Sequence, residues 1–120
     1  KRLGSYGKIS NFSFYFAHHM STIEGGMICT NDQEVYEIIR MLRSHGMVRE
    51  MNDAQRKQSY TQNYPDLNPD FIFSYPAYNV RSTELNAVLG RSQLAFLDEN
   101  NVLRNRNFNL FLVFSFNSHI

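Results

Sequence analysis

An alternating aromatic segment that runs into two adjacent histidines constrains the fold of this chain more than any other feature. Phe12, Phe14 and Phe16 alternate with Asn11, Ser13 and Tyr15. A period of two predicts a strand with one apolar face, and Ser13 and Tyr15 share the other face. The strand leads into a polar turn with His18, His19 and the run Glu24-Gly25-Gly26. Because α/β proteins place reactive groups where strands enter loops, we expect a functional site at this turn.

The length and charge of the chain argue against several classes of protein. One domain, or a part of one, is the limit for 120 residues. Lys and Arg number 12 against 11 Asp and Glu, a net charge of +1, so we expect no nucleic-acid partner. The single Cys29 lies in an apolar run and is predicted to be a buried, reduced thiol of a cytoplasmic protein.

Both ends of the chain indicate a segment of a longer protein. Residues 1–10 contain no apolar stretch typical of a signal peptide and no initiator Met. Residues 108–116 are the most apolar stretch, but they are shorter than the roughly 20 residues that a membrane-spanning helix needs. We therefore predict no membrane span and interpret residues 108–116 as a helix face that lacks its partner.

A short buried strand at residues 26–30 and an amphipathic helix are predicted after the histidine turn. Asn31 is the expected N-cap of this helix, with Glu34 completing a capping box. A helical stripe of apolar residues follows, made of Val35, Ile38, Ile39 and Leu42. The opposite face is charged and carries Glu34, Glu37, Arg40 and Arg43. Gly46 is predicted to end the helix in a left-handed conformation.

The second half of the sequence predicts a long loop and then a second helix. Residues 48–68 are polar without a periodic apolar face, which indicates a surface loop. Apolar character returns at residues 71–73 and ends at Pro76. Ser82 or Thr83 is the expected cap of the second helix, which Gly90 weakens by about 1 kcal/mol relative to Ala.

Two kinds of site are poorly supported by the residues. His18, His19 and His45 lack the Cys or carboxylate partners of a recognised metal-ligand spacing, so no metal site is predicted. A solvated turn explains the histidine pair, and a cation near a helix C-terminus explains His45. A serine hydrolase is not indicated either, because Ser13 lies outside any nucleophile elbow.

Four sequence blocks resemble, in their order and spacing, the DegT/DnrJ/EryC1/StrS family of pyridoxal-phosphate-dependent nucleotide-sugar enzymes. The blocks are Ser13-Phe14 with His18 and Glu24-Gly25-Gly26; Leu42-Arg43-Ser44-His45-Gly46; Ala77-Tyr78-Asn79-Val80-Arg81; and Thr83-Glu84-Leu85-Asn86-Ala87-Val88-Leu89-Gly90 with Gln93-Leu94. The resemblance implies an α/β fold, as part of the large domain of an aspartate aminotransferase-like (fold type I) enzyme. Residues 1–120 would be that part, and residues 83–116 would begin the long helix toward a C-terminal small domain.

The resemblance also implies a cofactor, partners and site residues. The cofactor would be pyridoxal 5'-phosphate or pyridoxamine 5'-phosphate, and the substrate a nucleotide sugar. Ser13 is expected to bind the cofactor phosphate, and Asn79 and Arg81 to reach a phosphate or substrate group across a homodimer interface. Tyr15 is either an acid/base assistant or a half-buried strand tyrosine. A reductase is a further expected partner.

His18 stands where the aminotransferases of this family have the lysine that forms a Schiff base with the cofactor, and an imidazole cannot form that link. Imidazole still moves protons at neutral pH. With histidine in place of lysine at position 18, the chain resembles the 3-dehydratase branch of the family. That branch removes the C3 hydroxyl of a 4-keto-6-deoxy sugar in surface polysaccharide (lipopolysaccharide O-antigen) biosynthesis. Segments matching the rest of the family are not in the sequence, so we expect this polypeptide alone to be inactive. The alternatives are an aminotransferase of the same family, and an inactive remnant or interaction module.

Overall fold

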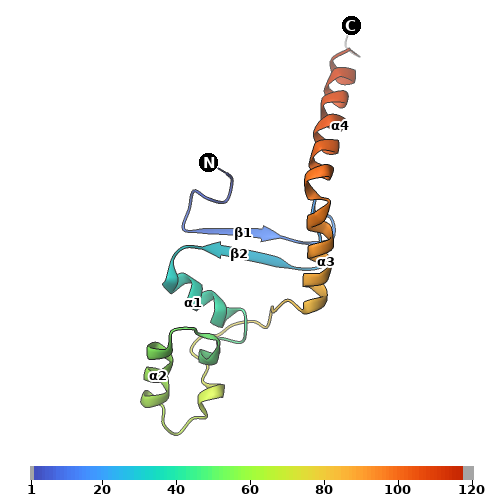
Figure 1. Ribbon diagram of the computed structural model, residues 1–120. Helices are drawn as coiled ribbons and strands as arrows, with labels where there is room; N and C mark the ends of the chain where they lie inside the picture. The colour runs from blue at the N-terminus through green and yellow to red at the C-terminus, as the bar shows by residue number, and fades with distance from the viewer. Residues whose placement is uncertain (1, 118–120) are drawn as a thin grey trace. The chain divides into compact units, whose positions relative to one another are not determined.

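The computed structural model describes residues 2–117 and combines strands with helices (Figure 1). The elements in chain order are β1 (Ile9–Ser13), β2 (Gly26–Thr30), α1 (Gln33–Leu42), the 3-10 helix η1 (Val48–Glu50), α2 (Ala54–Asn63), the 3-10 helix η2 (Pro69–Phe71), α3 (Glu84–Ala95) and α4 (Leu97–Asn117). The chain divides into two compact units. Unit 1 is Lys1–Asn11 with Ile28–Arg81, and unit 2 is Phe12–Met27 with Ser82–Ile120.

The two strands pair with each other in an antiparallel ladder (Figure 1). The prediction for residues 26–30 is confirmed, since β2 has these bounds. The prediction for the first strand is wrong at its end, because β1 stops at Ser13 and Phe16 lies beyond it, with 65% of its surface exposed. The chain turns after Phe14 because the amide of His18 donates to the carbonyl oxygen of Tyr15, which extended backbone does not allow.

The strands are more exposed than their sequence suggests. The predicted burial of β2 is wrong, and the Cys29 thiol is exposed. The reason is that the buried apolar cluster of the described residues lies elsewhere and includes no strand residue. A two-stranded sheet with neither face covered cannot bury its side chains.

Helix α1 begins one residue later than predicted. Its N-cap is Asp32 rather than Asn31, and Asp32 Oδ1 accepts hydrogen bonds from the amides of Glu34 and Val35 at 3.0 and 3.2 Å. The buried face also differs from the predicted stripe. Glu37 and Met41 are the buried residues of the helix, whereas Leu42 is exposed.

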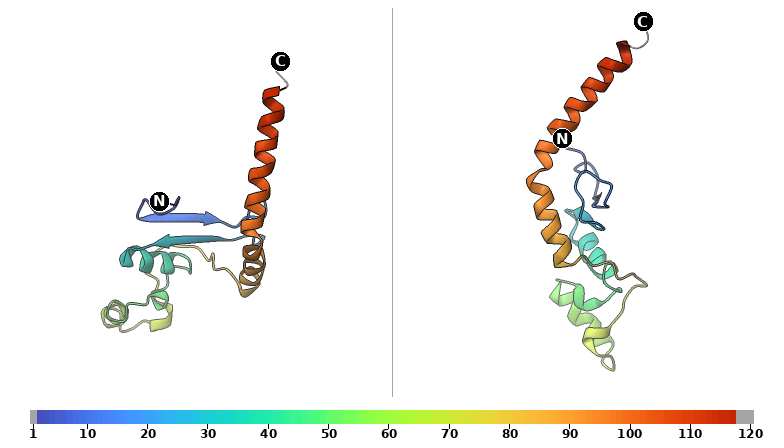
Figure 2. Two further views of the ribbon diagram at one scale, coloured as in Figure 1. Left: turned by 45° about the horizontal axis from the view of Figure 1, so that its top comes forward. Right: turned by 90° about the vertical axis from the view of Figure 1, so that its right-hand side faces the viewer.

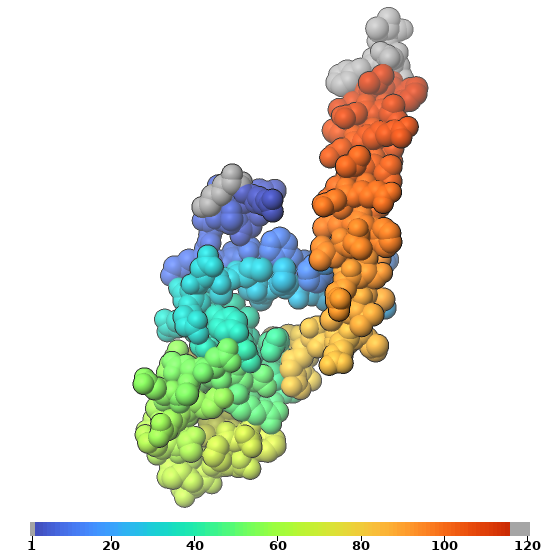
Figure 3. All heavy atoms as spheres, viewed as in Figure 1, coloured from blue at the N-terminus to red at the C-terminus, as the bar shows by residue number. Residues whose placement is uncertain are grey.

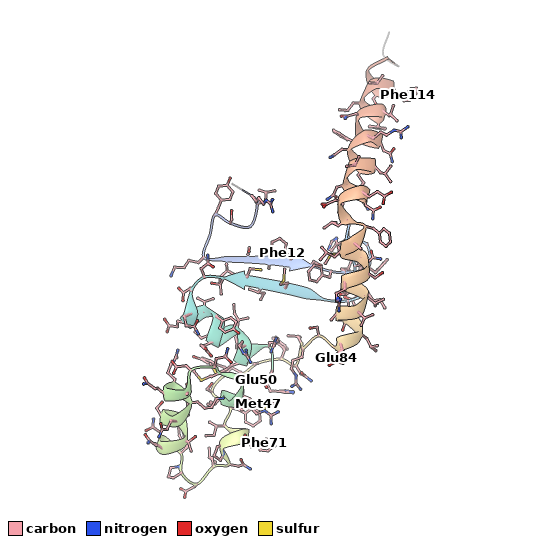
Figure 4. The ribbon with its side chains drawn as sticks, viewed as in Figure 1. Phe12, Met47, Glu50, Phe71, Glu84 and Phe114 are labelled. Carbon is pink, nitrogen blue, oxygen red and sulfur yellow. The ribbon has the colours of Figure 1, made fainter. Side chains whose placement is uncertain are left out.

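A small core holds unit 1 together. In Figure 4 the labels Met47, Glu50 and Phe71 mark the part of the chain that contains it. The core consists of Met41, Val48, Met51 and Ile72, with Ile38, Tyr60 and Tyr75 packed against it. The amide of Val48 donates to the carbonyl oxygen of Ile72 at 2.9 Å, so η1 lies against the chain that follows η2. The core therefore joins the end of α1 to residues far along the sequence.

The prediction of a loop over residues 48–68 is wrong, because η1 and α2 lie within it. Asp53 caps α2, and its carboxylate accepts hydrogen bonds from the amides of Gln55 and Arg56 at 3.0 Å. No residue of α2 is buried, which explains why an apolar pattern did not reveal it. The local signals for this helix are its cap residue and the run of helix-favouring residues Ala54-Gln55-Arg56-Lys57-Gln58.

Unit 2 contains α3 and α4, which follow each other with a break at Phe96 (Figure 2). The predicted cap is confirmed at Thr83, whose capping box includes Asn86. Apolar side chains of α4 are exposed, and Phe108, Phe111 and Phe114 are 60, 67 and 70% exposed. Figure 3 draws the heavy atoms of this helix in orange and red. An uncovered apolar helix face was predicted here; the side chain of Phe116, which belongs to the same prediction, lies outside the described residues.

Among the described residues, no helix combines the length and the apolar character needed to cross a membrane.

Candidate functional site

A closed loop connects the two strands and carries the histidine pair. We call residues 14–25 the histidine loop. The amide of Phe14 donates to the carbonyl oxygen of Gly25 at 2.8 Å, and the amide of Thr22 donates to the carbonyl oxygen of Phe14 at 2.9 Å. These two bonds tie both ends of the loop to one point at the end of the sheet.

Three of the predicted site residues lie together at the start of the histidine loop. The rings of Tyr15 and His18 pack edge to face, with 5.8 Å between their centroids, and the His18 amide donates to the Tyr15 carbonyl oxygen at 3.0 Å. Ser13 Oγ accepts a hydrogen bond from the Tyr15 amide at 3.4 Å. All three side chains are solvent-accessible, so Ser13 can offer its hydroxyl proton and His18 its ring nitrogens to a bound molecule.

Tight packing at the end of the histidine loop explains the glycine pair. A Cβ at Gly25 would collide with Oγ1 of Thr22, and a Cβ at Gly26 would lie 3.2 Å from the carbonyl oxygen of Phe12. Ile23, between them and the histidines, has a positive φ of 73°. The Glu-Gly-Gly run therefore closes the loop, and its glycines leave room for the Thr22 side chain and for the Phe12 backbone.

The other two predicted site residues belong to unit 1 and lie beside the end of α1. Asn79 forms an antiparallel bridge with Ser44, and the amide of Val80 donates to the carbonyl oxygen of Arg43 at 2.9 Å. Nε of Arg81 donates to Oδ1 of Asn79 at 3.3 Å, and both side chains are exposed. The structure thus brings together two sequence blocks that are more than thirty residues apart.

The predicted site residues therefore fall into two groups. Ser13, Tyr15 and His18 form one group in unit 2, and Asn79 and Arg81 form the other in unit 1. The second group supplies a guanidinium and an amide, which are donors suited to an anion.

Sequence reasoning missed Asn86, which lies in the first turn of α3. Its Nδ2 donates to the carbonyl oxygens of Thr22 at 3.0 Å and Glu24 at 3.1 Å, so it binds the histidine loop directly. Asn86 also lines a surface hollow together with Phe14, Met20, Thr22, Gly25, Gly26, Ser82, Ala87 and Gly90. The available signal was the Thr83 capping box, which placed Asn86 at the helix start but gave no reason to link it to the loop.

A polar network in unit 1 was also missed. Nη1 of Arg40 donates to the hydroxyl oxygen of Tyr36 at 3.0 Å, and this bond lowers the pKa of Tyr36. The carboxylate of Glu37 is buried and accepts hydrogen bonds from the Asn52 amide at 2.8 Å and from Gln33 Nε2 at 2.9 Å. Glu37 was predicted on the exposed face, and its hydrogen bonds are what allow its burial.

The described residues contain no group of three or more His, Cys, Asp or Glu side chains placed to hold a metal ion.

Comparison with known proteins places these observations in a wider context. The model of the DegT/DnrJ/EryC1/StrS aminotransferase family matches residues 1–112. GDP-4-keto-6-deoxy-D-mannose 3-dehydratase of Yersinia pseudotuberculosis is 34% identical over 111 residues, which cover 92% of this chain and 28% of that protein. The chain therefore spans less than a third of the length of this relative.

Two solved structures are similar to the chain. The E. coli GDP-4-keto-6-deoxy-D-mannose-3-dehydratase with bound hydrated PLP has a TM-score of 0.71 and 33% identity, covering 93% of this chain and 28% of that one. A point mutant of GDP-4-keto-6-deoxymannose-3-dehydratase with bound GDP-perosamine has a TM-score of 0.67 and 31% identity, covering 91% and 28%. The predicted fold, α/β and part of a fold type I enzyme, is confirmed.

Proposed function

Because the chain belongs to the DegT/DnrJ/EryC1/StrS aminotransferase family, we propose that its protein removes the C3 hydroxyl of a nucleotide-linked 4-keto-6-deoxy sugar. The cofactor is pyridoxal 5'-phosphate, used in its pyridoxamine form. The product enters surface polysaccharide biosynthesis, and the reaction takes place in the cytoplasm. The names of the relatives support the substrate class, since the first of them acts on GDP-4-keto-6-deoxy-D-mannose.

The observation that carries the proposal is the position of His18 at the start of the histidine loop. An aminotransferase of this family needs a lysine at this position, because the lysine amine forms a Schiff base with the cofactor. An imidazole cannot form that link. The ring of His18 is exposed and packs edge to face against Tyr15, so a bound molecule can contact its ring nitrogens. The position therefore retains a proton-transfer group but no group for covalent attachment.

The donor groups of the chain fit the cofactor that the family uses. Its phosphate requires hydrogen-bond donors, and Ser13 has an exposed hydroxyl at the end of β1. Arg81 and Asn79 are exposed and hydrogen-bonded to each other at 3.3 Å, which presents a cation and an amide side by side. We assign the cofactor phosphate to Ser13, and a phosphate or substrate group to Asn79 and Arg81 across a homodimer interface.

When bound, the cofactor supplies an electron-withdrawing pyridine ring that makes a proton on its C4′ carbon removable. With the cofactor bound, a ring nitrogen of His18 would take up that proton and would deliver a proton to the C3 hydroxyl, which would leave as water. Tyr15 holds the His18 ring by the edge-to-face contact and assists the proton transfer with its hydroxyl. Ser13 orients the phosphate end, so that the position of His18 relative to the proton is determined by β1 and the histidine loop.

We further propose how the chain fits into its protein. Residues 1–120 are part of the large domain, and α4 is the start of the long helix that leads to a C-terminal small domain. The exposed apolar side chains of α4 support this assignment, because they need a covering layer in the complete protein. The protein acts as a homodimer, and a reductase is its further partner.

A product analysis of the full-length protein tests the reaction. The protein is incubated with a GDP-linked 4-keto-6-deoxy sugar, pyridoxamine phosphate and a reductant, and the sugar is analysed by mass spectrometry. We expect a 3-deoxy product, which lacks one oxygen atom, and no 4-amino sugar when glutamate is added. Formation of a 4-amino sugar with glutamate would identify an aminotransferase, and absence of any product would favour an inactive remnant.

A further inference from the structure

Thr22 is the anchor of the histidine loop. Only 6% of its surface is exposed, although it lies in a loop that is otherwise largely solvent-accessible. Its amide donates to Phe14 across the base of the loop, and its hydroxyl donates to the carbonyl oxygen of Glu24 at 2.9 Å. A residue with this many internal bonds determines where the neighbouring backbone lies.

Asn86 holds this anchor with the full hydrogen-bonding capacity of its side chain. Its Oδ1 accepts from the amide and the hydroxyl of Thr83 at 2.9 and 2.7 Å. Its Nδ2 donates both protons, to the carbonyl oxygens of Thr22 and Glu24. The Oδ1 atom thus serves the start of α3, and the Nδ2 atom serves the loop.

Gly90 allows α3 to approach the same anchor closely. It lies four residues after Asn86, so both occupy one face of the helix. A Cβ at Gly90 would lie 3.1 Å from Cγ2 of Thr22, which is closer than ordinary van der Waals contact. The glycine in the middle of α3, which by itself weakens the helix, is therefore explained by its contact with the histidine loop.

We propose that Asn86 and Gly90 form a clasp on Thr22 that determines the position of His18, and that Asn86 is a positioning residue of the reaction. This inference rests on the proposed function. The histidine loop has two attachments, one through β1 and β2 and one through the clasp. Without the clasp, the loop keeps only its sheet attachment, and His18 loses its defined orientation while Ser13 stays on β1.

The substitution Asn86→Asp separates the two roles of the side chain. An aspartate oxygen still accepts from Thr83, so the cap of α3 is retained. The two donors to the loop are lost, and a carboxylate oxygen faces the carbonyl oxygens of Thr22 and Glu24 instead. Asn107→Asp is the matched control, since Asn107 is exposed on α4 and the charge change is the same.

The test uses the full-length protein with pyridoxamine phosphate. Three quantities are measured: hydrogen exchange of the Thr22 and Phe14 amides, and kcat and KM for formation of the 3-deoxy product. For Asn86→Asp we expect exchange to rise by roughly tenfold or more, since two hydrogen bonds are lost. We expect kcat to fall by roughly ten- to a hundredfold with little change in KM, because misplacement affects the proton-transfer group rather than sugar binding. Asn107→Asp leaves all three quantities unchanged.

Gly90→Ala provides a second variant should Asn86→Asp fail to fold. Alanine favours a helix over glycine, so faster exchange in the loop cannot arise from a weaker α3. Unchanged exchange in the loop in these variants overturns the clasp, and faster exchange with unchanged kcat overturns the positioning role. If the parent protein forms no 3-deoxy sugar, the proposed function fails, while the exchange measurement still decides whether the clasp exists.

Discussion

The amide of His45 donates a hydrogen bond to the carbonyl oxygen of Tyr78 at 2.7 Å. Both residues belong to sequence blocks of the family, one at the end of α1 and one before α3. His45 has a positive φ of 59°, and the next residue, Gly46, has one of 76°. This left-handed turn directs the backbone after α1 along residues 72–80, where it pairs with Ile72, Ser74, Tyr78 and Asn79.

Gly46→Ala is expected to destabilise unit 1. A Cβ at Gly46 would collide with the carbonyl group of Tyr75, and the positive φ disfavours any side chain. We expect the free energy of unfolding to fall by about 2 kcal/mol or more, measured by urea denaturation. Gly7→Ala is the matched control, because a Cβ there makes only ordinary contact at 3.6 Å. Equal effects of the two substitutions would contradict the role of the turn.

Glu37→Ala is expected to weaken the packing of α1 against the segment before α2. Glu37 is 1% exposed, and its carboxylate accepts a hydrogen bond from the Asn52 amide. That amide loses its partner in the variant. We expect a loss of about 1–3 kcal/mol in the free energy of unfolding. Glu34→Ala serves as control because Glu34 lies on the exposed side of the same helix. A variant as stable as the parent would show that the buried carboxylate makes no net contribution.

The cap of α1 is expected to depend on pH through Asp32. The Val35 amide and then the hydrogen bond from Lys8 Nζ lower the pKa of Asp32 below its ordinary 3.8. A lowered pKa in the folded chain means that the stabilisation is complete above pH 3.8 and is lost as the pH falls through the lowered pKa.

Circular dichroism during acid titration checks this sign. Asp32→Asn retains a cap oxygen but does not titrate, so its helix content should fall less than that of the parent below pH 3.8. Other carboxylates titrate in both proteins, and the difference between the two curves isolates Asp32. Identical curves would be evidence against the contribution of this carboxylate.

His18→Gln is expected to reduce formation of the 3-deoxy sugar by about a hundredfold or more, because the amide of glutamine moves no proton. His19→Gln is the matched control, since it removes the neighbouring imidazole of the same loop. A similar loss in both variants would refute a specific role of His18. His18→Lys should in addition restore the visible absorbance of a lysine-linked cofactor, recorded in the full-length protein with pyridoxal phosphate.

Local patterns allowed several elements to be predicted, and each failure has a physical cause. The bounds of β2 and the cap at Thr83 were correct because a short apolar run and a capping residue are local signals, whereas the burial of β2 was not. The end of β1 was wrong because the alternation of phenylalanines continues past Ser13 while the hydrogen bonds do not. Helix α2 was missed because none of its residues is fully buried and only Tyr60 packs against the core, so no apolar pattern marks it.

The sequence by itself determined the family and the identity of the group at position 18, because the order of motifs and a single residue type are properties of the chain. Only the tertiary structure decided which residues support that position. Asn86 lies 64 residues from Thr22, and Gly90 is four residues further along. Their contacts with the histidine loop depend on hydrogen bonds and close packing between distant segments, and no local pattern encodes these.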